Sequence, residues 1–279
     1  MHLVIQGADI ETRDLKALAK LSGASAIDRL SDSAFRLSNA QPASGIAELC
    51  GGARLDFGFV PEGRRLGDFR LLVMDMDSTL ITMETIDELA DMVGIKAEVA
   101  KITESAMRGE IEYDESLRRR LALLRGLDES ALQRVYDERL RFSPGAEAML
   151  EKVRAAGIRT LLVYDAFSYM TDRLKTRVKL DYTHSNALEI ANGKLTGKVI
   201  GDIVNADMKR ATLLRVAAEL GISRTQIAGV GDGANDLKFM AECGVSVAYR
   251  AKPVVREKTT YAINHAGLDA MLYLLSAEQ

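Results

Sequence analysis

The chain has 279 residues, enough for one large domain or two, and 47% of them are hydrophobic. Its formal net charge is −3, with both signs mixed along the chain, which argues against a nucleic-acid partner or an anionic membrane surface. No apolar run reaches the ~18 residues of a membrane span, and no basic, hydrophobic leader opens the chain, so we expect a cytoplasmic protein.

Cysteine and histidine are too scattered to build a site. Cys50 and Cys243 are far apart and form no CxxC pair, and His2, His184 and His265 are equally dispersed. Disulfide frameworks and zinc sites both require clustered residues. We therefore expect neither of them.

The N-terminal part predicts short elements in the order βαββαβ, which is the ferredoxin-like arrangement. Residues 61–68, PEGRRLGD, combine proline, glycine and charge and are typical of a linker. We therefore expect a ferredoxin-like α+β domain over residues 1–62 and a second domain over residues 69–279. The predicted strands are 3–7, 25–30, 34–38 and 54–60, and the predicted helices are 12–21 and 42–50.

Two carboxylates directly follow the first strand of the second domain. Residues 71–80, LLVMDMDSTL, begin as an apolar run that predicts a buried strand and continue through Asp75 and Asp77. Open α/β sheets bind their ligands at the carboxyl ends of strands. Taken alone, this pattern fits equally well a strand followed by a helix-capping loop.

An insertion from about residue 84 to residue 143 predicts helices only. The first begins with a capping box over residues 85–88 and ends at Gly94, and the others are near 96–106, 114–125 and 129–140. An insertion at this place can fold over a site as a lid and exclude water.

The chain then predicts a return to the sheet. We expect a helix over 146–155, a strand over 158–163, an amphipathic helix over 168–178, and a hairpin over 188–195 with an Asn-Gly turn. Lys209 opens a further predicted helix, in which a lysine is most simply a surface charge.

A second acidic motif follows a later strand. Residues 226–236, QIAGVGDGAND, predict an apolar strand that ends in glycines, Asp232 and Asp236. Because parallel strands share an edge at their carboxyl ends, these acids can converge with Asp75 and Asp77. Four crowded carboxylates repel one another unless a cation neutralises them. Mg²⁺ fits best, because it takes oxygen ligands and leaves room for waters and a phosphate.

The motifs DMDST and GDGAND, with a lysine between them, resemble the haloacid dehalogenase superfamily and, within it, the phosphoserine phosphatase family. The resemblance covers residues 69–279. It implies a doubly wound parallel-sheet (Rossmann-like) α/β core with a helical cap. It also implies a Mg²⁺-dependent hydrolysis of O-phosphoserine to serine and phosphate through an aspartyl-phosphate, the last step of serine biosynthesis. The N-terminal domain resembles an ACT-type domain, which implies amino-acid sensing or homodimer contacts, and a purely structural module is equally open.

The resemblance also assigns roles to residues. Asp75 would be the nucleophile and Asp77 the general acid and then the base. Metal would be bound by Asp75, the backbone carbonyl of Asp77 and Asp232, with Asp236 in support. The expected substrate ligands are Glu84, Met107, Tyr113, Arg120, Lys209 and Asn235.

For the cap residues, the chemistry agrees with that resemblance without proving it. Arg120 can bind an α-carboxylate, Glu84 can pair with an α-ammonium, and Met107 with Tyr113 can form an apolar wall. On spacing alone, each is more simply a solvated or core side chain.

One segment departs from the family pattern. After the strand 158–163 the family has Ser-Gly-Gly-Phe, which holds the phosphate through its hydroxyl and backbone NH groups, whereas this chain has Tyr164-Asp165-Ala166-Phe167. Tyr164 displaces the hydroxyl, and Asp165 adds a negative charge beside a dianionic phosphate. Losing one such donor costs ~10²–10³ in rate. We expect both residues to line the substrate site.

Three functions are therefore compatible with the sequence. The first is a phosphoserine phosphatase, slow or altered in substrate. The second is a weakened or inactive homologue that binds phosphoserine in a regulatory role, and the third is a phosphotransferase. Retention of both Asp75 and Asp77 favours the enzyme, since a pure binder has no evident need of an acid beside the nucleophile.

Overall fold

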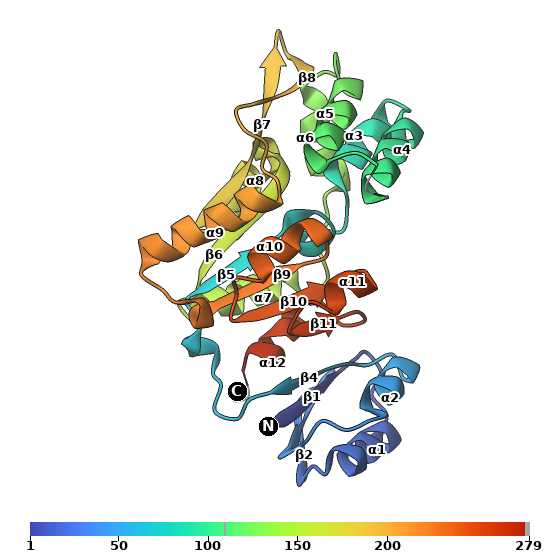
Figure 1. Ribbon diagram of the computed structural model, residues 1–279, viewed down its shortest axis with the longest axis vertical. Helices are drawn as coiled ribbons and strands as arrows, with labels where there is room; N and C mark the ends of the chain where they lie inside the picture. The colour runs from blue at the N-terminus through green and yellow to red at the C-terminus, as the bar shows by residue number, and fades with distance from the viewer. Residues whose placement is uncertain (109, 277–279) are drawn as a thin grey trace.

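The computed structural model describes residues 1–108 and 110–276. In Figure 1 the described chain forms a small N-terminal unit, a central α/β core and a group of helices at the end far from the N-terminal unit. A four-stranded sheet has the order β2-β3-β1-β4, and a seven-stranded sheet has the order β11-β10-β9-β5-β6-β7-β8.

The N-terminal unit has the predicted βαββαβ order. All of its strand pairs are antiparallel, and Leu3 and Ile5 of β1 pack under both helices. The second helix begins at Ile46 rather than near residue 42, because Gly45 adopts a left-handed backbone (φ 88°) that a helix cannot contain. The elements are β1 (His2–Gln6), α1 (Thr12–Ser22), β2 (Ala26–Ser31), β3 (Ala34–Ser38), α2 (Ile46–Gly52) and β4 (Asp56–Val60).

The core is a largely parallel sheet covered on both faces, which confirms the predicted fold class. Leu72 and Met74 of β5 face one hydrophobic cluster, while Leu71 and Val73 face the other. Helix α7 covers the first face and α9 with α10 cover the second. The strands are β5 (Leu71–Met74), β6 (Arg159–Phe167), β7 (Tyr182–Ala191), β8 (Lys194–Ile200), β9 (Ile227–Gly231), β10 (Val245–Tyr249) and β11 (Tyr261–Ile263).

The remaining core elements follow the same pattern. Only β8 runs antiparallel to its neighbour in this sheet, through the predicted hairpin whose turn is Asn192-Gly193, both at positive φ. The helices are α7 (Ala146–Ala155), α8 (Ser168–Val178), α9 (Ala206–Leu220), α10 (Leu237–Met240), α11 (Pro253–Arg256) and α12 (Met271–Leu275). None of the helices in the described chain is long and apolar enough to cross a membrane.

The insertion after β5 is helical, as predicted. Its elements are α3 (Thr85–Met92), α4 (Lys96–Met107), α5 (Tyr113–Leu123), α6 (Ser130–Arg134) and a π-helical turn (Val135–Arg139). The predicted capping box at residue 85 is wrong: Glu84 precedes the helix and makes no side-chain cap. The Thr85 hydroxyl instead donates to Asp77, which follows β5.

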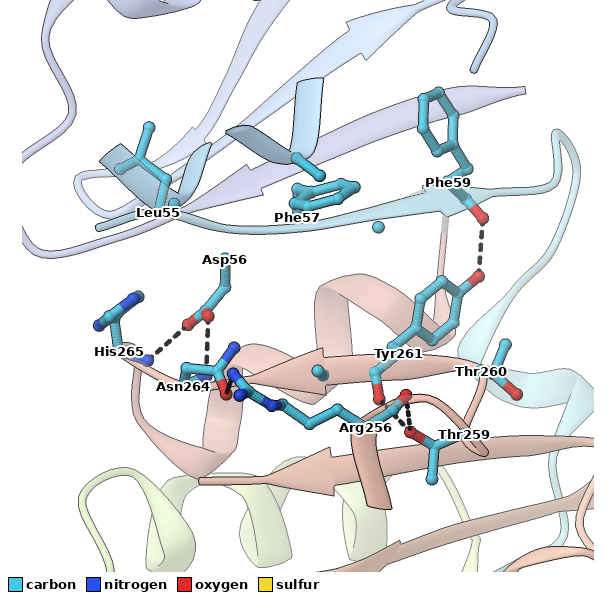
Figure 2. Close-up of a pocket in the computed structure, with 14 residues that line it drawn as sticks. Leu55, Asp56, Phe57, Phe59, Arg256, Thr259, Thr260, Tyr261, Asn264 and His265 are labelled. Atoms are coloured by element: carbon cyan, nitrogen blue, oxygen red, sulfur yellow. Dashed lines mark hydrogen bonds between the residues drawn. The ribbon is translucent and has the colours of Figure 1, made fainter. Parts of the chain in front are cut away.

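The two sheets meet at their edge strands, β4 and β11. Figure 2 shows the Asp56 carboxylate directed at the loop after β11, where it accepts the backbone N–H groups of Asn264 and His265. The N–H of Ala266 is a third donor, and the three distances are 2.7–2.9 Å. The Tyr261 hydroxyl donates to the Phe59 carbonyl at 2.8 Å. A cavity of about 500 Å³ lies between these strands. Asp56 therefore fastens the N-terminal unit to the core.

Candidate active site

Three carboxylates converge at the carboxyl edge of the core sheet. Strands β5 and β9 are parallel neighbours, and the N–H of Asp75 extends their pairing by donating to the Val230 carbonyl at 3.1 Å. One oxygen from each of Asp75, Asp232 and Asp236 lies within 4.8 Å of the others. The sequence predicted that four acids would converge here, and the structure brings together three of them but not Asp77.

A buried lysine pairs with two of these acids. Lys209 is fully buried, and its Nζ lies 2.7 Å from Asp75 Oδ1 and 3.0 Å from Asp236 Oδ1. Burial alone would lower the pKa of this lysine, but Asp165, Asp236 and Asp75 raise it well above its usual value. The side chain is therefore a cation inside the site and not the surface charge that its helical position suggested.

The start of α9 positions that lysine. Asn205 caps the helix, and its side-chain oxygen accepts the backbone N–H groups of Asp207 and Met208 at 3.1 Å. Its amide also donates to Asp114 of the cap at 3.1 Å. The Asn205 side chain thus fixes the first turn of α9, from which Lys209 points inward.

The acidic cluster fits a hard divalent cation. Burial, followed by the charge of Asp236, raises the pKa of Asp75 well above its usual range and raises that of Asp232 to about 7. Crowded carboxylates of this kind offer the all-oxygen ligand set that Mg²⁺ takes. Gly231 lets the Asp236 carboxylate pack directly against the end of β9, since a Cβ at this position would lie 2.5 Å from Asp236 Oδ2.

Asp77 lies in a different environment from Asp75. Its carboxylate accepts the Thr85 N–H at 2.8 Å and the Thr85 hydroxyl at 2.9 Å, both from the first turn of the cap. The Tyr164 hydroxyl donates to it at 3.1 Å from β6. Burial and then the charge of Glu84 raise the pKa of Asp77 well above its usual range. Its side chain is thus anchored to the cap and to β6, apart from the cluster of three carboxylates.

Two threonines support the acids, although the sequence patterns indicated no role in the site for either of them. Thr79 donates to Asp232 Oδ1 at 2.8 Å, and Thr85 makes the two bonds to Asp77. Thr79 lies within the DMDST motif, but nothing in the sequence shows that its partner would be 153 residues away. Ser78 lies between Asp77 and Thr79 and has a left-handed backbone with φ 56°. Its hydroxyl donates to Glu84 at 2.6 Å.

Residues 164–167, which replace the Ser-Gly-Gly-Phe of the family pattern, belong to β6. This strand continues to Phe167 instead of ending near residue 163. The β6–β7 register shifts between Val163 and Phe167. Tyr164 is fully buried, and burial raises the pKa of its hydroxyl well above the usual value. The structure directs that hydroxyl to Asp77.

Asp165 lies beside the residues expected to bind phosphate. Its Oδ2 accepts the Asn235 side-chain amide at 2.9 Å and is 3.9 Å from Lys209 Nζ. Its backbone carbonyl accepts the Asn186 amide at 2.7 Å and the Tyr113 hydroxyl at 3.4 Å. Asn186, in β7, is a further site residue that no sequence pattern indicated.

The predicted cap ligands differ in their placement. Arg120 is half-buried, unlike its neighbours Arg118 and Arg119, and within the described chain its buried Nε has no hydrogen-bond partner. Tyr113 reaches the core through Asp165. Met107 ends α4 with 61% of its surface exposed, and its sulfur lies 3.6 Å from Lys252 Nζ.

The fold and this carboxylate–lysine site define a class of hydrolase. A family model described as haloacid dehalogenase-like hydrolase matches residues 72–241, and a second, described as a domain of unknown function (DUF4072), matches residues 3–44. The first model spans more than half of the chain.

The relatives narrow that class. A phosphoserine phosphatase from Polaromonas sp. is 50% identical over 216 residues, which is 76% of this chain and 92% of the relative. The solved structure of a probable phosphoserine phosphatase from Vibrio cholerae has a TM-score of 0.86 at 33% identity, covering 99% of this chain and 86% of that one. A phospho-aspartyl intermediate analogue of a phosphoserine phosphatase has a TM-score of 0.69 at 34% identity, over 74% of this chain and 98% of that one. The chain belongs to the phosphoserine phosphatase family of the haloacid dehalogenase-like hydrolases.

Proposed function

We propose that the protein hydrolyses O-phospho-L-serine to serine and inorganic phosphate. The observation that carries this proposal is the separation of the two acids of the DMD motif: Asp75 pairs with Lys209 in the acidic cluster, while Asp77 is held beneath the cap. This difference in surroundings supports different roles for the two carboxylates, one in attack on phosphorus and the other in proton transfer.

The reaction needs two steps. In the first, a carboxylate oxygen of Asp75 forms a bond to phosphorus, the bond from phosphorus to the serine oxygen breaks, and Asp77 gives its proton to that oxygen. In the second, Asp77 takes a proton from water, the water oxygen attacks phosphorus, and the bond to Asp75 breaks. Serine and inorganic phosphate leave, and both aspartates return to their first state.

A Mg²⁺ ion would be held by Asp75, the backbone carbonyl of Asp77 and Asp232, with Asp236 in support. When bound, the ion would neutralise charge on the phosphoryl oxygens. Lys209 and Asn235 would bind the same phosphoryl group from the protein side. The buried position of Lys209 supports this role, because a desolvated cation interacts strongly with an anion.

The cap would recognise the serine part. Arg120 has an unpartnered buried Nε in the described chain and would bind the α-carboxylate, which it can hold through two parallel hydrogen bonds. Glu84 would pair with the α-ammonium. Tyr113 contacts Asp165 and would close the wall of the site, with Met107 at the edge of the cap.

For the N-terminal unit, we propose an ACT-like domain over residues 1–62 that forms a homodimer, joined to the phosphatase domain over residues 69–279. Its edge strand β2 supports this, since among the described residues it pairs only with β3 and leaves Ile27 41% exposed. Analytical ultracentrifugation of the wild type beside Ile27→Lys tests it: a dimer that the variant dissociates supports the proposal, and a wild-type monomer contradicts it.

The activity itself is tested by phosphate release from O-phospho-L-serine, with and without Mg²⁺. We expect Mg²⁺-dependent release that Asp75→Asn lowers by more than about 10³-fold, because the nucleophile is lost. O-Phosphoethanolamine lacks the carboxylate and should have a lower kcat/KM than O-phospho-L-serine. Arg120→Ala should reduce the ratio between the kcat/KM values of the two esters. Equal turnover of the two esters by the wild type would contradict the substrate assignment.

A further inference from the structure

We propose that Asp165 is an internal competitor for phosphate and so determines how tightly the site binds the phosphoryl group. This inference rests on the proposed function, because it takes Lys209 and Asn235 to be the phosphate ligands. It adds that their anion site already contains a carboxylate of the chain itself.

The contacts of Asp165 carry the inference. Its Oδ2 accepts the Asn235 amide at 2.9 Å and lies 3.9 Å from Lys209 Nζ, so one oxygen faces both groups. The Lys209 side chain is fully buried and that of Asp165 is only 18% exposed. Little water is therefore available to screen a charge at this position.

The backbone around Asp165 is held firmly in this arrangement. The Asn186 amide donates to its carbonyl at 2.7 Å, and Asn186 Oδ1 accepts the Val204 N–H at 2.8 Å. Tyr164 is fixed on the other side by its bond to Asp77. A phosphate can therefore displace the Asp165 side chain, but the strand that carries it stays in place.

Two consequences follow for the reaction. Phosphate and the carboxylate compete for the same donors and repel each other, so free phosphate binds weakly. A substrate overcomes that competition only with binding energy from its amino-acid part, which the cap supplies. Asp165 thus favours substrates with a recognised leaving group over phosphate alone and limits inhibition by the phosphate product.

The test measures the binding of inorganic phosphate to the Mg²⁺-loaded protein by isothermal titration calorimetry. Asp165→Asn removes the charge and keeps the bulk, while Asp165→Ser removes both. The matched control is Asp172→Asn in α8, which makes the same change in net charge at an exposed position. Circular dichroism first establishes that each variant is folded.

We expect the Kd for phosphate to fall by about 10- to 100-fold in the Asn and Ser variants, since a like charge at close range is removed, and to stay constant in the control. An unchanged or higher Kd in both folded variants, or no phosphate binding by any of the proteins, overturns the inference. Hydrolysis of O-phospho-L-serine by the same samples is scored separately. Tighter phosphate binding by the variants, without hydrolysis by any of the proteins, would contradict the proposed function and still support Asp165 as the competitor. Hydrolysis with an unchanged Kd for phosphate would support the proposed function and contradict the role of Asp165.

Discussion

At the scale of single residues, the two acids of the DMD motif are made different by their partners. Asp75 has a cation at 2.7 Å, whereas Asp77 has the N–H and hydroxyl of Thr85 and the hydroxyl of Tyr164. Those donors fix the direction of the Asp77 carboxylate, and a proton-transfer group must be placed within hydrogen-bond reach of its target. We therefore infer that Tyr164 positions Asp77.

The Tyr164→Phe variant tests this role. It removes the hydroxyl that donates to Asp77 and keeps the buried ring. We expect kcat to fall by about tenfold with little change in KM, because the proposed role of Asp77 is in proton transfer. The free energy of unfolding should fall by about 1–3 kcal/mol, because a buried bond to an acid is lost. Steady-state kinetics and urea unfolding measure the two effects.

Tyr182→Phe is the matched control. The Tyr182 hydroxyl donates to Glu219 in an exposed position at the amino end of β7, whereas the site lies at the carboxyl edge of the sheet. This variant should leave kcat unchanged. A wild-type kcat in Tyr164→Phe, or a loss confined to KM, would show that the tyrosine does not position Asp77.

The sequence predicted the acids of the site better than their supports. Asp75, Asp232 and Asp236 could be foreseen to converge because each follows an apolar strand, and the edges of parallel strands coincide. The partners of Tyr164 and Asp165 could not, because they depend on side-chain direction within a strand that shifts register. Asn186 gave no signal, since a lone asparagine in a strand belongs to no motif.

At the scale of elements, the junction between β4 and β11 depends on one buried acid. Asp56 is 2% exposed and receives its three backbone N–H donors from the loop after β11. Gly58 lies in the same strand, and a Cβ there would be 2.6 Å from Leu274 Cδ2. The two sheets are therefore joined by a charged contact and by close packing.

We expect Asp56→Asn to lower the free energy of unfolding by about 2–4 kcal/mol, because the amide presents a donor toward backbone N–H groups and removes the charge that they stabilise. Urea unfolding followed by circular dichroism measures it, and limited proteolysis should cut faster in the linker, residues 61–68. Asp32→Asn, at a side chain that is 98% exposed, is the control. Equal stability of Asp56→Asn and the wild type would rule out this role for Asp56.

Element order was predictable from the sequence, but the contacts between elements were not. The spacing of apolar residues identified the βαββαβ unit and the helical insertion, because that spacing recurs over several residues in each element. The Asn-Gly turn residues identified the hairpin. The start of α2 and the length of β6 differ from the prediction because a left-handed glycine and a pairing with β7 decide them. The meeting of β4 with β11 joins residues about 200 apart, which no local pattern encodes.

For the molecule as a whole, the crowded carboxylates of the site repel one another, and a bound divalent cation would reduce that repulsion. Asp232 has its pKa raised to about 7 by burial and by Asp236, and Asp75 is shifted in the same direction. A bound divalent ion would stabilise the folded chain, since the unfolded chain does not bring these acids together.

Thermal unfolding tests this coupling. Mg²⁺ at about 100 times its Kd should raise stability by ~2.7 kcal/mol, which corresponds to a Tm increase of about 5–10 °C for a chain of this size. EDTA should reverse the increase. Asp232→Asn should abolish the response to Mg²⁺, whereas Asp207→Asn, at an exposed acid paired with Lys238, should keep it. A Tm independent of Mg²⁺ in the wild type would contradict a cation site at this cluster.

The central claim is that Asp75 becomes phosphorylated during turnover. The most direct measurement is acid quenching of the Mg²⁺-loaded protein within milliseconds of mixing with ³²P-labelled O-phospho-L-serine, followed by peptide mapping. We predict acid-stable, hydroxylamine-sensitive label on the peptide that contains Asp75, and none in Asp75→Asn. Turnover of the substrate with label on another residue, or with no covalent label while Asp75→Asn remains active, would contradict the account.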